Sequence, residues 1–153
     1  MRMSCVARYQ TTIRSPWSSA RAFDYMADVR NFVDWDPSIR GVVQVVGVGG
    51  GVDTEFDIEV AHPGGSTTFR YRTTHYAPFT SLRLEARTRS LTSVDRIDVA
   101  DDGSGCLVTY DAELDLNGPR MLFDPLLGWM FGRIGDRAAR GLETMLEGAR
   151  TER

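Results

Sequence analysis

Residues 22–37 read AFDYMADVRNFVDWDP, and this stretch decides the fold because it places helical turns inside a chain that otherwise alternates in polarity. Apolar residues recur at helical spacing over residues 20–27, which predicts a helix. The pair Ser15–Pro16 is typical of an N-cap followed by a first helical residue. Residues 31–35 are expected to form one more turn, because Pro37 pushes the residue before it out of the helical region.

Strands are predicted on both sides of these helices. Residues 6–13 alternate, so that Ala7, Tyr9, Thr11 and Ile13 share one face. Beyond Pro37, clusters of glycine, proline or aspartate separate six further strands. They cover residues 39–48, 54–61, 67–76, 81–89, 92–100 and 106–116. Their short connections indicate an antiparallel meander.

The C-terminal part of the chain, from Pro119 to about Glu147, has helical periodicity. Its apolar stripe contains Leu126, Met130, Ile134, Ala138, Leu142 and Met145. Such a helix is roughly 40 Å long and crosses the molecule. We therefore expect an α+β fold in one domain over residues 1–153. A curved seven-stranded antiparallel sheet wraps round the long C-terminal helix, two short helices follow the first strand, and one helix leaves a cavity on the concave side.

The amino-acid composition argues against several kinds of partner and site. All 18 basic residues are arginine, and the net charge of −3 with a pI near 5.4 argues against a nucleic-acid partner. Two histidines and two cysteines cannot form a three-histidine or four-cysteine zinc site, so no metal or cofactor is expected, and Cys5 and Cys106 are interpreted as small buried residues. No apolar run approaches the roughly 20 residues of a membrane span, and no signal peptide is evident, which favours the cytoplasm.

The element order and three stretches of sequence resemble the START and polyketide cyclase/dehydrase superfamily, also called SRPBCC, which includes the Bet v-type allergens. Residues 13–37 are similar to its opening motif, residues 51–56 to the entry of its third strand, and residues 103–110 to its "G-x-G-T-x-V-x-Y" strand. Ser15, Val33 and Cys106 depart from the usual alanine, proline and threonine. The resemblance implies the helix-grip fold and a pocket for a small hydrophobic ligand of lipid, polyketide or aromatic type, but it implies no single reaction.

Alternation and polar side-chain tips suggest which residues line that pocket. The candidates are Tyr9, Trp35, Phe56, Phe69, Tyr71, Thr73, His75, Tyr110, Trp129, Met130 and Ile134. Binding of a small hydrophobic molecule by a monomer or homodimer is the leading hypothesis. A completely filled core would instead favour an interaction module.

A cyclase or dehydratase is the alternative hypothesis. Tyr71 and His75 lie four residues apart on one predicted strand, and alternation assigns both to the interior. His75 could then exchange a proton with a bound polyketide while Tyr71 or Tyr110 holds an enolate oxygen. The other interpretation of His75 is a hydrogen-bonded core residue.

Three further features stay open or have structural interpretations. Arg96 and Asp98 share one face of their strand and Asp95 shares the other with Ile97, so the register decides which charge points inward. Asp34 and Asp36 are interpreted as helix-end capping residues. The resemblance to the family implies that the glycine-rich loop at residues 47–51 lies over the cavity entrance and acts as a lid or gate.

Overall fold

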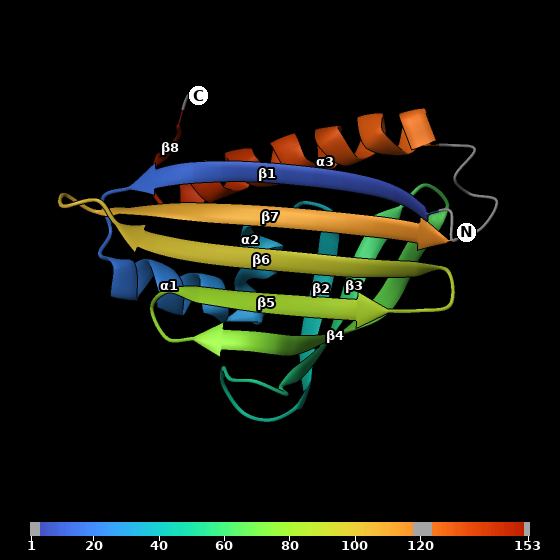
Figure 1. Ribbon diagram of the computed structural model, residues 1–153, viewed down its shortest axis with the longest axis horizontal. Helices are drawn as coiled ribbons and strands as arrows, with labels where there is room; N and C mark the ends of the chain where they lie inside the picture. Colours follow the sequence, from blue (N-terminus) through green and yellow to red (C-terminus); the bar gives the residue numbers. More distant parts are fainter. Residues whose placement is uncertain (1–3, 118–123, 152–153) are drawn as a thin grey trace.

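One antiparallel sheet and one long helix, α3, make up most of the structure, a computed structural model that describes residues 4–117 and 124–151 (Figure 1). The sheet order is β2-β3-β4-β5-β6-β7-β1-β8. Its strands are β1 (Ser4–Ser15), β2 (Ile39–Val46), β3 (Glu55–His62), β4 (Gly65–Ala77), β5 (Ser81–Arg87), β6 (Leu91–Asp101), β7 (Cys106–Asn117) and β8 (Ala149–Arg150). The helices are α1 (Ser19–Ala27), a 3₁₀ turn η1 (Val29–Asn31), α2 (Phe32–Trp35) and α3 (Asp124–Met145).

The sheet bends strongly, because β2 and β3 run steeply across the direction of β5, β6, β7 and β1 (Figure 1). Helix α3 lies along β1 and continues behind it, while α1 and α2 lie at the end of the sheet where β1 finishes (Figure 1). This arrangement confirms the helix-grip fold, with two short helices after the first strand. Within the described residues no helix is long and apolar enough to cross a membrane.

The strand count differs from the expected seven because the chain forms a short eighth strand after α3. Glu147 adopts a positive φ of 53°, and the Gly148 amide donates to the Glu143 carbonyl at 2.9 Å, which ends the helix. The chain then pairs β8 with Ile13 and Arg14 of β1. This pairing fixes the C-terminal end of α3 to the sheet.

The first helix starts later than the sequence indicates. Ser18, not Ser15, is the N-cap of α1, since its hydroxyl accepts from the Arg21 amide at 3.2 Å. Ser15 ends β1 instead, and its hydroxyl donates to the Leu146 carbonyl at 2.6 Å while accepting from the Trp17 amide. The predicted N-cap thus connects β1 to the last turn of the helical region. The predicted start of the long helix at Pro119 lies outside the described residues.

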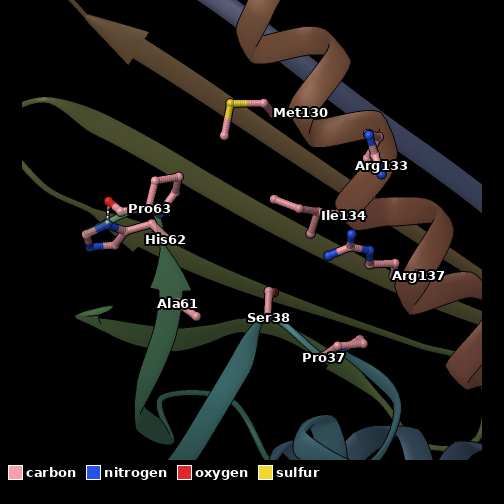
Figure 2. Close-up of a pocket in the computed structure, with 9 residues that line it drawn as sticks. All are labelled: Pro37, Ser38, Ala61, His62, Pro63, Met130, Arg133, Ile134 and Arg137. Atoms are coloured by element: carbon pink, nitrogen blue, oxygen red, sulfur yellow. Dashed lines mark hydrogen bonds between the residues drawn. The ribbon is translucent and has the colours of Figure 1, made fainter. Parts of the chain in front are cut away.

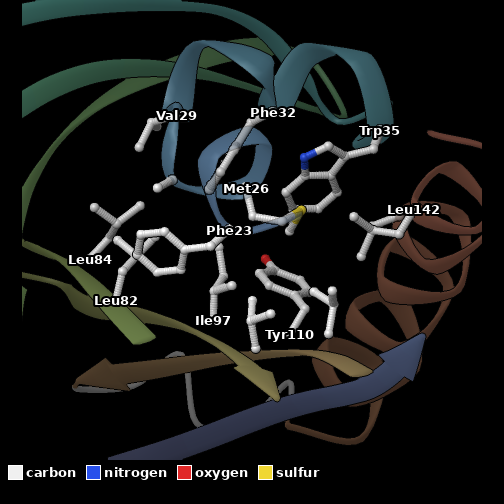
Figure 3. Packing of buried hydrophobic residues seen from close by; sticks show 14 of the residues in the cluster. Phe23, Met26, Val29, Phe32, Trp35, Leu82, Leu84, Ile97, Tyr110 and Leu142 are labelled. Carbon is white, nitrogen blue, oxygen red and sulfur yellow. The ribbon is translucent and has the colours of Figure 1, made fainter. Parts of the chain in front are cut away.

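A hydrophobic core fills one end of the space between sheet and helices (Figure 3). Phe32 packs on Trp35 with ring centroids 4.8 Å apart, and Trp35 packs edge-on against Tyr110 at 5.1 Å. The other labelled residues of this cluster are Phe23, Met26, Val29, Leu82, Leu84, Ile97 and Leu142. Strand alternation is confirmed for most inward residues, including Phe56, Ile58, Leu82, Ala86, Val108 and Ala112, which are buried.

Glycine allows α3 to approach α2 closely. A Cβ atom at Gly141 would lie 1.9 Å from the Trp35 carbonyl oxygen and 2.7 Å from the carbonyl carbon. No real Cβ fits there, and backbone atoms cannot rotate away as a side chain would. Gly132, earlier on the same helix, has nothing within 4 Å of the equivalent position.

We predict that Gly141→Ala destabilises the protein by about 1–3 kcal/mol because it forces α3 away from α2. Gly132→Ala is the matched control, and it should stabilise the protein by up to about 1 kcal/mol because alanine is the better helix former. Urea denaturation followed by circular dichroism measures both. Equal stability of the two variants would contradict the close packing.

Candidate functional site

A cavity of about 230 Å³ lies between α3 and the inner face of the sheet. Its walls come from β1, β2, β3, β4, β6, β7 and α3, and most of them are apolar. The apolar lining consists of Ile39, Ile58, Val60, Ala61, Phe69, Leu91, Ala112, Leu114, Met130, Phe131, Ile134 and Ala138. The space between sheet and helix is therefore incompletely filled, as the single-helix argument predicts.

A second hollow of about 350 Å³ adjoins the cavity (Figure 2). On one side it is bordered by the end of β3, the β3–β4 turn and the start of β2, and on the other by α3. The two hollows share Ser38, Ala61, His62, Met130 and Ile134 as lining residues. We call the outer hollow the entrance cleft, because it is the more open and borders the cavity directly.

Five polar side chains meet at the wall of the cavity, and we call them the polar cluster: Asp36, Tyr71, Ser93, Asp95 and Tyr110. The Tyr71 hydroxyl donates to Ser93 Oγ at 2.8 Å, and the Tyr110 hydroxyl donates to Asp95 Oδ2 at 3.4 Å. They come from β4, β6, β7 and the residue after α2, so four separate parts of the chain build the cluster.

Asp36 is held by its own turn. Its Oδ1 accepts from the Ser38 amide at 2.9 Å and from the Ser38 hydroxyl at 2.7 Å. Only 7% of the residue is exposed, and burial raises the pKa of the carboxyl although the two Ser38 bonds oppose that shift. Asp36 is the C-cap of α2 through its backbone amide, which donates to the Phe32 carbonyl at 2.9 Å, and its side chain also lines the cavity. Asp34 lies within α2 instead and accepts from the Tyr25 hydroxyl at 3.3 Å.

Burial raises the pKa of Asp95 to about 7, and the nearby charge of Asp36 adds to this effect. The Tyr110 hydrogen bond and the charge of Arg96 act in the opposite direction. Burial also raises the pKa of Tyr71 and of Tyr110, so both remain protonated donors at neutral pH. The cavity wall therefore carries one carboxyl that changes charge near neutral pH.

Six of the residues predicted to line the pocket do border the cavity: Tyr9, Phe69, Tyr71, Tyr110, Met130 and Ile134. Trp35, Phe56 and Thr73 are buried, but they belong to the packed interior and do not border this cavity. Thr73, for example, shares a hydrogen bond with the Thr54 hydroxyl at 2.9 Å. Trp129 lies in α3, and its side chain is outside the described part of the chain.

The prediction that His75 points inward with Tyr71 is wrong. The pairing of β4 with β5 shifts between Thr73 and His75, so that Thr74 is an extra residue on β4. After this bulge Tyr76 points inward against Phe23, at 5.5 Å between ring centroids, and His75 is exposed on the outer face. His75 there bonds to the Ser81 hydroxyl at 2.8 Å, away from the cavity. The acid/base pair of Tyr71 and His75 does not exist in this structure.

The register of β6 resolves the open question of its charges. Asp95 points into the cavity and Arg96 lies on the outer face, 3.5 Å from Glu113, while Asp98 is exposed. The inward orientation of Asp95 could have been predicted from the sequence, because alternation places Asp95 on the same strand face as the apolar residue Ile97, which is buried. Nothing local in the sequence indicated that Asp36, after a helix and before a proline, would reach the same cavity.

The prediction that the loop at residues 47–51 covers the cavity entrance is also wrong. The loop at residues 47–51 lies against Tyr76, since a Cβ at Gly50 would be 2.8 Å from the Tyr76 hydroxyl oxygen. Neither the cavity nor the entrance cleft is lined by this loop. The turn at His62 and Pro63 borders the entrance cleft instead, and the His62 ring bonds to the Pro63 carbonyl oxygen (Figure 2). The other ring nitrogen of His62 bonds to Thr67 Oγ1.

Metal ligands are not assembled in the part of the chain that the structure describes, where no three histidine, cysteine, aspartate or glutamate side chains are grouped to hold an ion. Cys106 is a buried free thiol. The side chain of Cys5 is outside the described part. The polar groups that line the cavity are carboxyl, hydroxyl and phenol groups and the His62 ring.

The sequence matches a family described as polyketide cyclase / dehydrase and lipid transport over residues 6–147. This match confirms the family resemblance of the sequence. No curated protein matches the chain.

Solved structures of similar architecture cover most of the chain. A protein of Thermus thermophilus has a TM-score of 0.74 at 14% identity, with 93% of this chain and 97% of that chain covered. A START superfamily protein from Mycobacterium smegmatis has a TM-score of 0.67 at 15% identity, with 93% and 97% covered. The di-domain ARO/CYC StfQ from the steffimycin biosynthetic pathway has a TM-score of 0.70 at 13% identity, with 94% of this chain and 52% of that chain covered. At these identities the likeness shows the fold.

We predict that Asp95→Asn changes how stability depends on pH. The folded protein retains the Asp95 proton up to about pH 7, whereas the unfolded chain releases it near pH 4, so stability falls as pH rises through this window. Asparagine does not titrate, so the variant does not lose stability in this way as the pH rises. Its free energy of unfolding relative to wild type should therefore rise by roughly 2 kcal/mol between pH 5 and pH 8.

Urea denaturation at the two pH values measures this difference. Asp98→Asn, on the exposed face of the same strand, is the matched control and should give the same difference from wild type at both pH values. A pH-independent effect of Asp95→Asn would show that the Asp95 carboxyl is ionised throughout.

Proposed function

Because this chain belongs to the polyketide cyclase / dehydrase and lipid transport family, we propose that its cavity binds one small, largely apolar molecule. The observation that carries this proposal is the cavity between α3 and the sheet, with its apolar walls and its adjoining entrance cleft. Apolar walls with a few convergent polar groups are typical of small-molecule sites. The ligand enters through the cleft beside the β3–β4 turn.

The size of the cavity limits the ligand. At about 230 Å³ it is smaller than a typical small-molecule pocket of roughly 300–1,000 Å³. A one- or two-ring body or a short alkyl chain fits inside, and a longer ligand extends into the entrance cleft. Burying about 250 Å² of apolar ligand surface contributes roughly 6 kcal/mol, and the cost of immobilising the ligand lowers the expected affinity to the micromolar range or weaker.

The alternative function, a polyketide cyclase or dehydratase, needs an acid/base group other than His75. Asp95 is the candidate that the geometry offers, since it lines the cavity beside the Tyr110 hydroxyl. Cyclisation through an enolate also requires donors or positive charge at the enolate oxygen. The two phenols of the polar cluster donate to other side chains instead, Tyr71 to Ser93 and Tyr110 to Asp95, which favours binding over enolate chemistry.

We predict that Ile134→Trp weakens ligand binding. Ile134 borders both the cavity and the entrance cleft, so an indole at this position fills the space that the ligand needs. Isothermal titration calorimetry with uncharged 1-naphthalenemethanol measures the effect, and we expect affinity to fall at least about tenfold, or roughly 1.4 kcal/mol.

Val43→Trp is the control, because Val43 is 62% exposed on β2 and does not line either hollow. It should bind the alcohol as the wild type does. Absence of binding by the wild-type protein to this and to other uncharged aromatic or alkyl alcohols would overturn the proposed function.

A further inference from the structure

Charge inside the cavity narrows the class of ligand. We propose that the cavity takes a ligand whose apolar body carries a basic amine, and that Asp36 and Asp95 face the resulting ammonium group. This inference rests on the proposed binding function and adds the chemistry of the ligand's polar end. Two carboxyl groups in one small and otherwise mostly apolar cavity are its starting observation.

Each of the two carboxyl groups has an oxygen available to a ligand. Asp36 uses Oδ1 for both Ser38 bonds, and Asp95 uses Oδ2 for the long Tyr110 bond of 3.4 Å. No hydrogen bond from the residues that the structure describes reaches Asp36 Oδ2 or Asp95 Oδ1. An ammonium group has three donors and no acceptor, so it can serve both free oxygens at once.

The groups that face Asp95 from neighbouring elements are neutral or acidic. Tyr110 on β7 and Tyr71 on β4 are phenols, and Asp36 after α2 is the second carboxyl. Tyr9 on β1 directs its hydroxyl to Asp136 of α3 at 3.0 Å. None of these groups can neutralise a buried carboxylate.

No arginine of the described part of the chain lines the cavity. Arg96 is on the outer face beside Glu113, and Asp111 on that face is paired with Arg8. Arg133 and Arg137 of α3 border the entrance cleft but not the cavity. His62 lines the cavity at the β3–β4 turn, with its ring engaged by Pro63 and Thr67.

A buried carboxylate without a cation is costly, and a ligand ammonium supplies the missing charge. A ligand carboxylate would meet two groups of its own sign and lose affinity by repulsion and desolvation. An alcohol with the same apolar body is uncharged, so it is neither attracted as an ammonium group is nor repelled as a carboxylate is. The cavity should therefore rank amine, alcohol and carboxylate in that order, and should discriminate against fatty acids.

Affinity for the amine should depend on pH. In the empty cavity Asp95 changes charge near pH 7, and an ammonium ion favours its carboxylate form. Below that pH, binding must expel a proton from the Asp95 carboxyl: the acid O–H bond breaks, the proton goes to solvent, and the carboxylate pairs with the ammonium. Amine affinity should therefore rise between about pH 6 and pH 8, while alcohol affinity stays constant.

The test compares three probes that share one ring system: 1-naphthalenemethanamine, 1-naphthalenemethanol and 1-naphthoate. Calorimetry at pH 8 with the wild-type protein should give an amine affinity at least about tenfold above that of the alcohol, and a carboxylate affinity below both. At pH 6 the advantage of the amine should shrink. Equal affinity for amine and alcohol at pH 8 would overturn the inference and leave the proposed function intact.

Aspartate variants test which carboxyl group is responsible for the preference for the amine. Asp95→Asn should lower the affinity for the amine toward that for the alcohol, and measurable alcohol binding by the same variant reports an intact cavity. Asp98→Asn, on the outer face of the same strand, should keep the wild-type ranking. If Asp95→Asn fails to bind the alcohol, Asp36→Asn replaces it as the test variant. Retention of the full amine advantage in both aspartate variants would contradict the role of these carboxyls, and failure of all three probes with the wild-type protein would count against the proposed function itself.

Discussion

The close contact between α3 and the rest of the fold at one end of the helix is the constraint on which the other features depend. Gly141 lets α3 meet the Trp35 carbonyl, Gly148 lets the chain turn beside the Arg14 carbonyl, and Ser15 bonds to Leu146. These contacts fix the C-terminal half of α3 against α2 and β1. The other half, around Met130 and Ile134, spans a bent sheet that a single helix cannot fill, and the cavity lies there.

The placement of two carboxyl groups in that cavity opposes folding. Burial of Asp95 and Asp36 disfavours their charged forms, and the hydrogen bonds that reach them come from hydroxyl groups and the Ser38 amide, with no arginine in the cavity lining. The Ser38 and Tyr110 hydrogen bonds offset part of this cost. Unfavourable polar burial that packing does not need is typical of a functional site. In this chain the same two side chains limit stability at high pH and select the ligand.

The architecture is common to proteins with unrelated tasks, so the fold alone does not determine what this chain binds. The side chains that face the cavity carry that information. Apolar residues from five strands and α3 set its size, and the polar cluster sets its chemistry. His75 lies with Arg83 and Arg96 at a hollow on the outer face of the sheet, and among the described residues none lines both that hollow and the cavity.

The sequence by itself determined the order of the elements before β8, the inward faces of most strands and the need for a cavity, because polarity patterns are local and one helix is too narrow for a long curved sheet. It placed Tyr9, Phe69, Tyr71, Tyr110, Met130 and Ile134 on the cavity side for the same reason. Only the tertiary structure decided that a bulge turns His75 outward, that the β6 register turns Asp95 inward, and that Asp36 meets it from another part of the chain. A bulge and a strand register depend on how two strands pair, and a contact between residues far apart in the sequence depends on packing. Neither can be predicted from a single stretch of sequence.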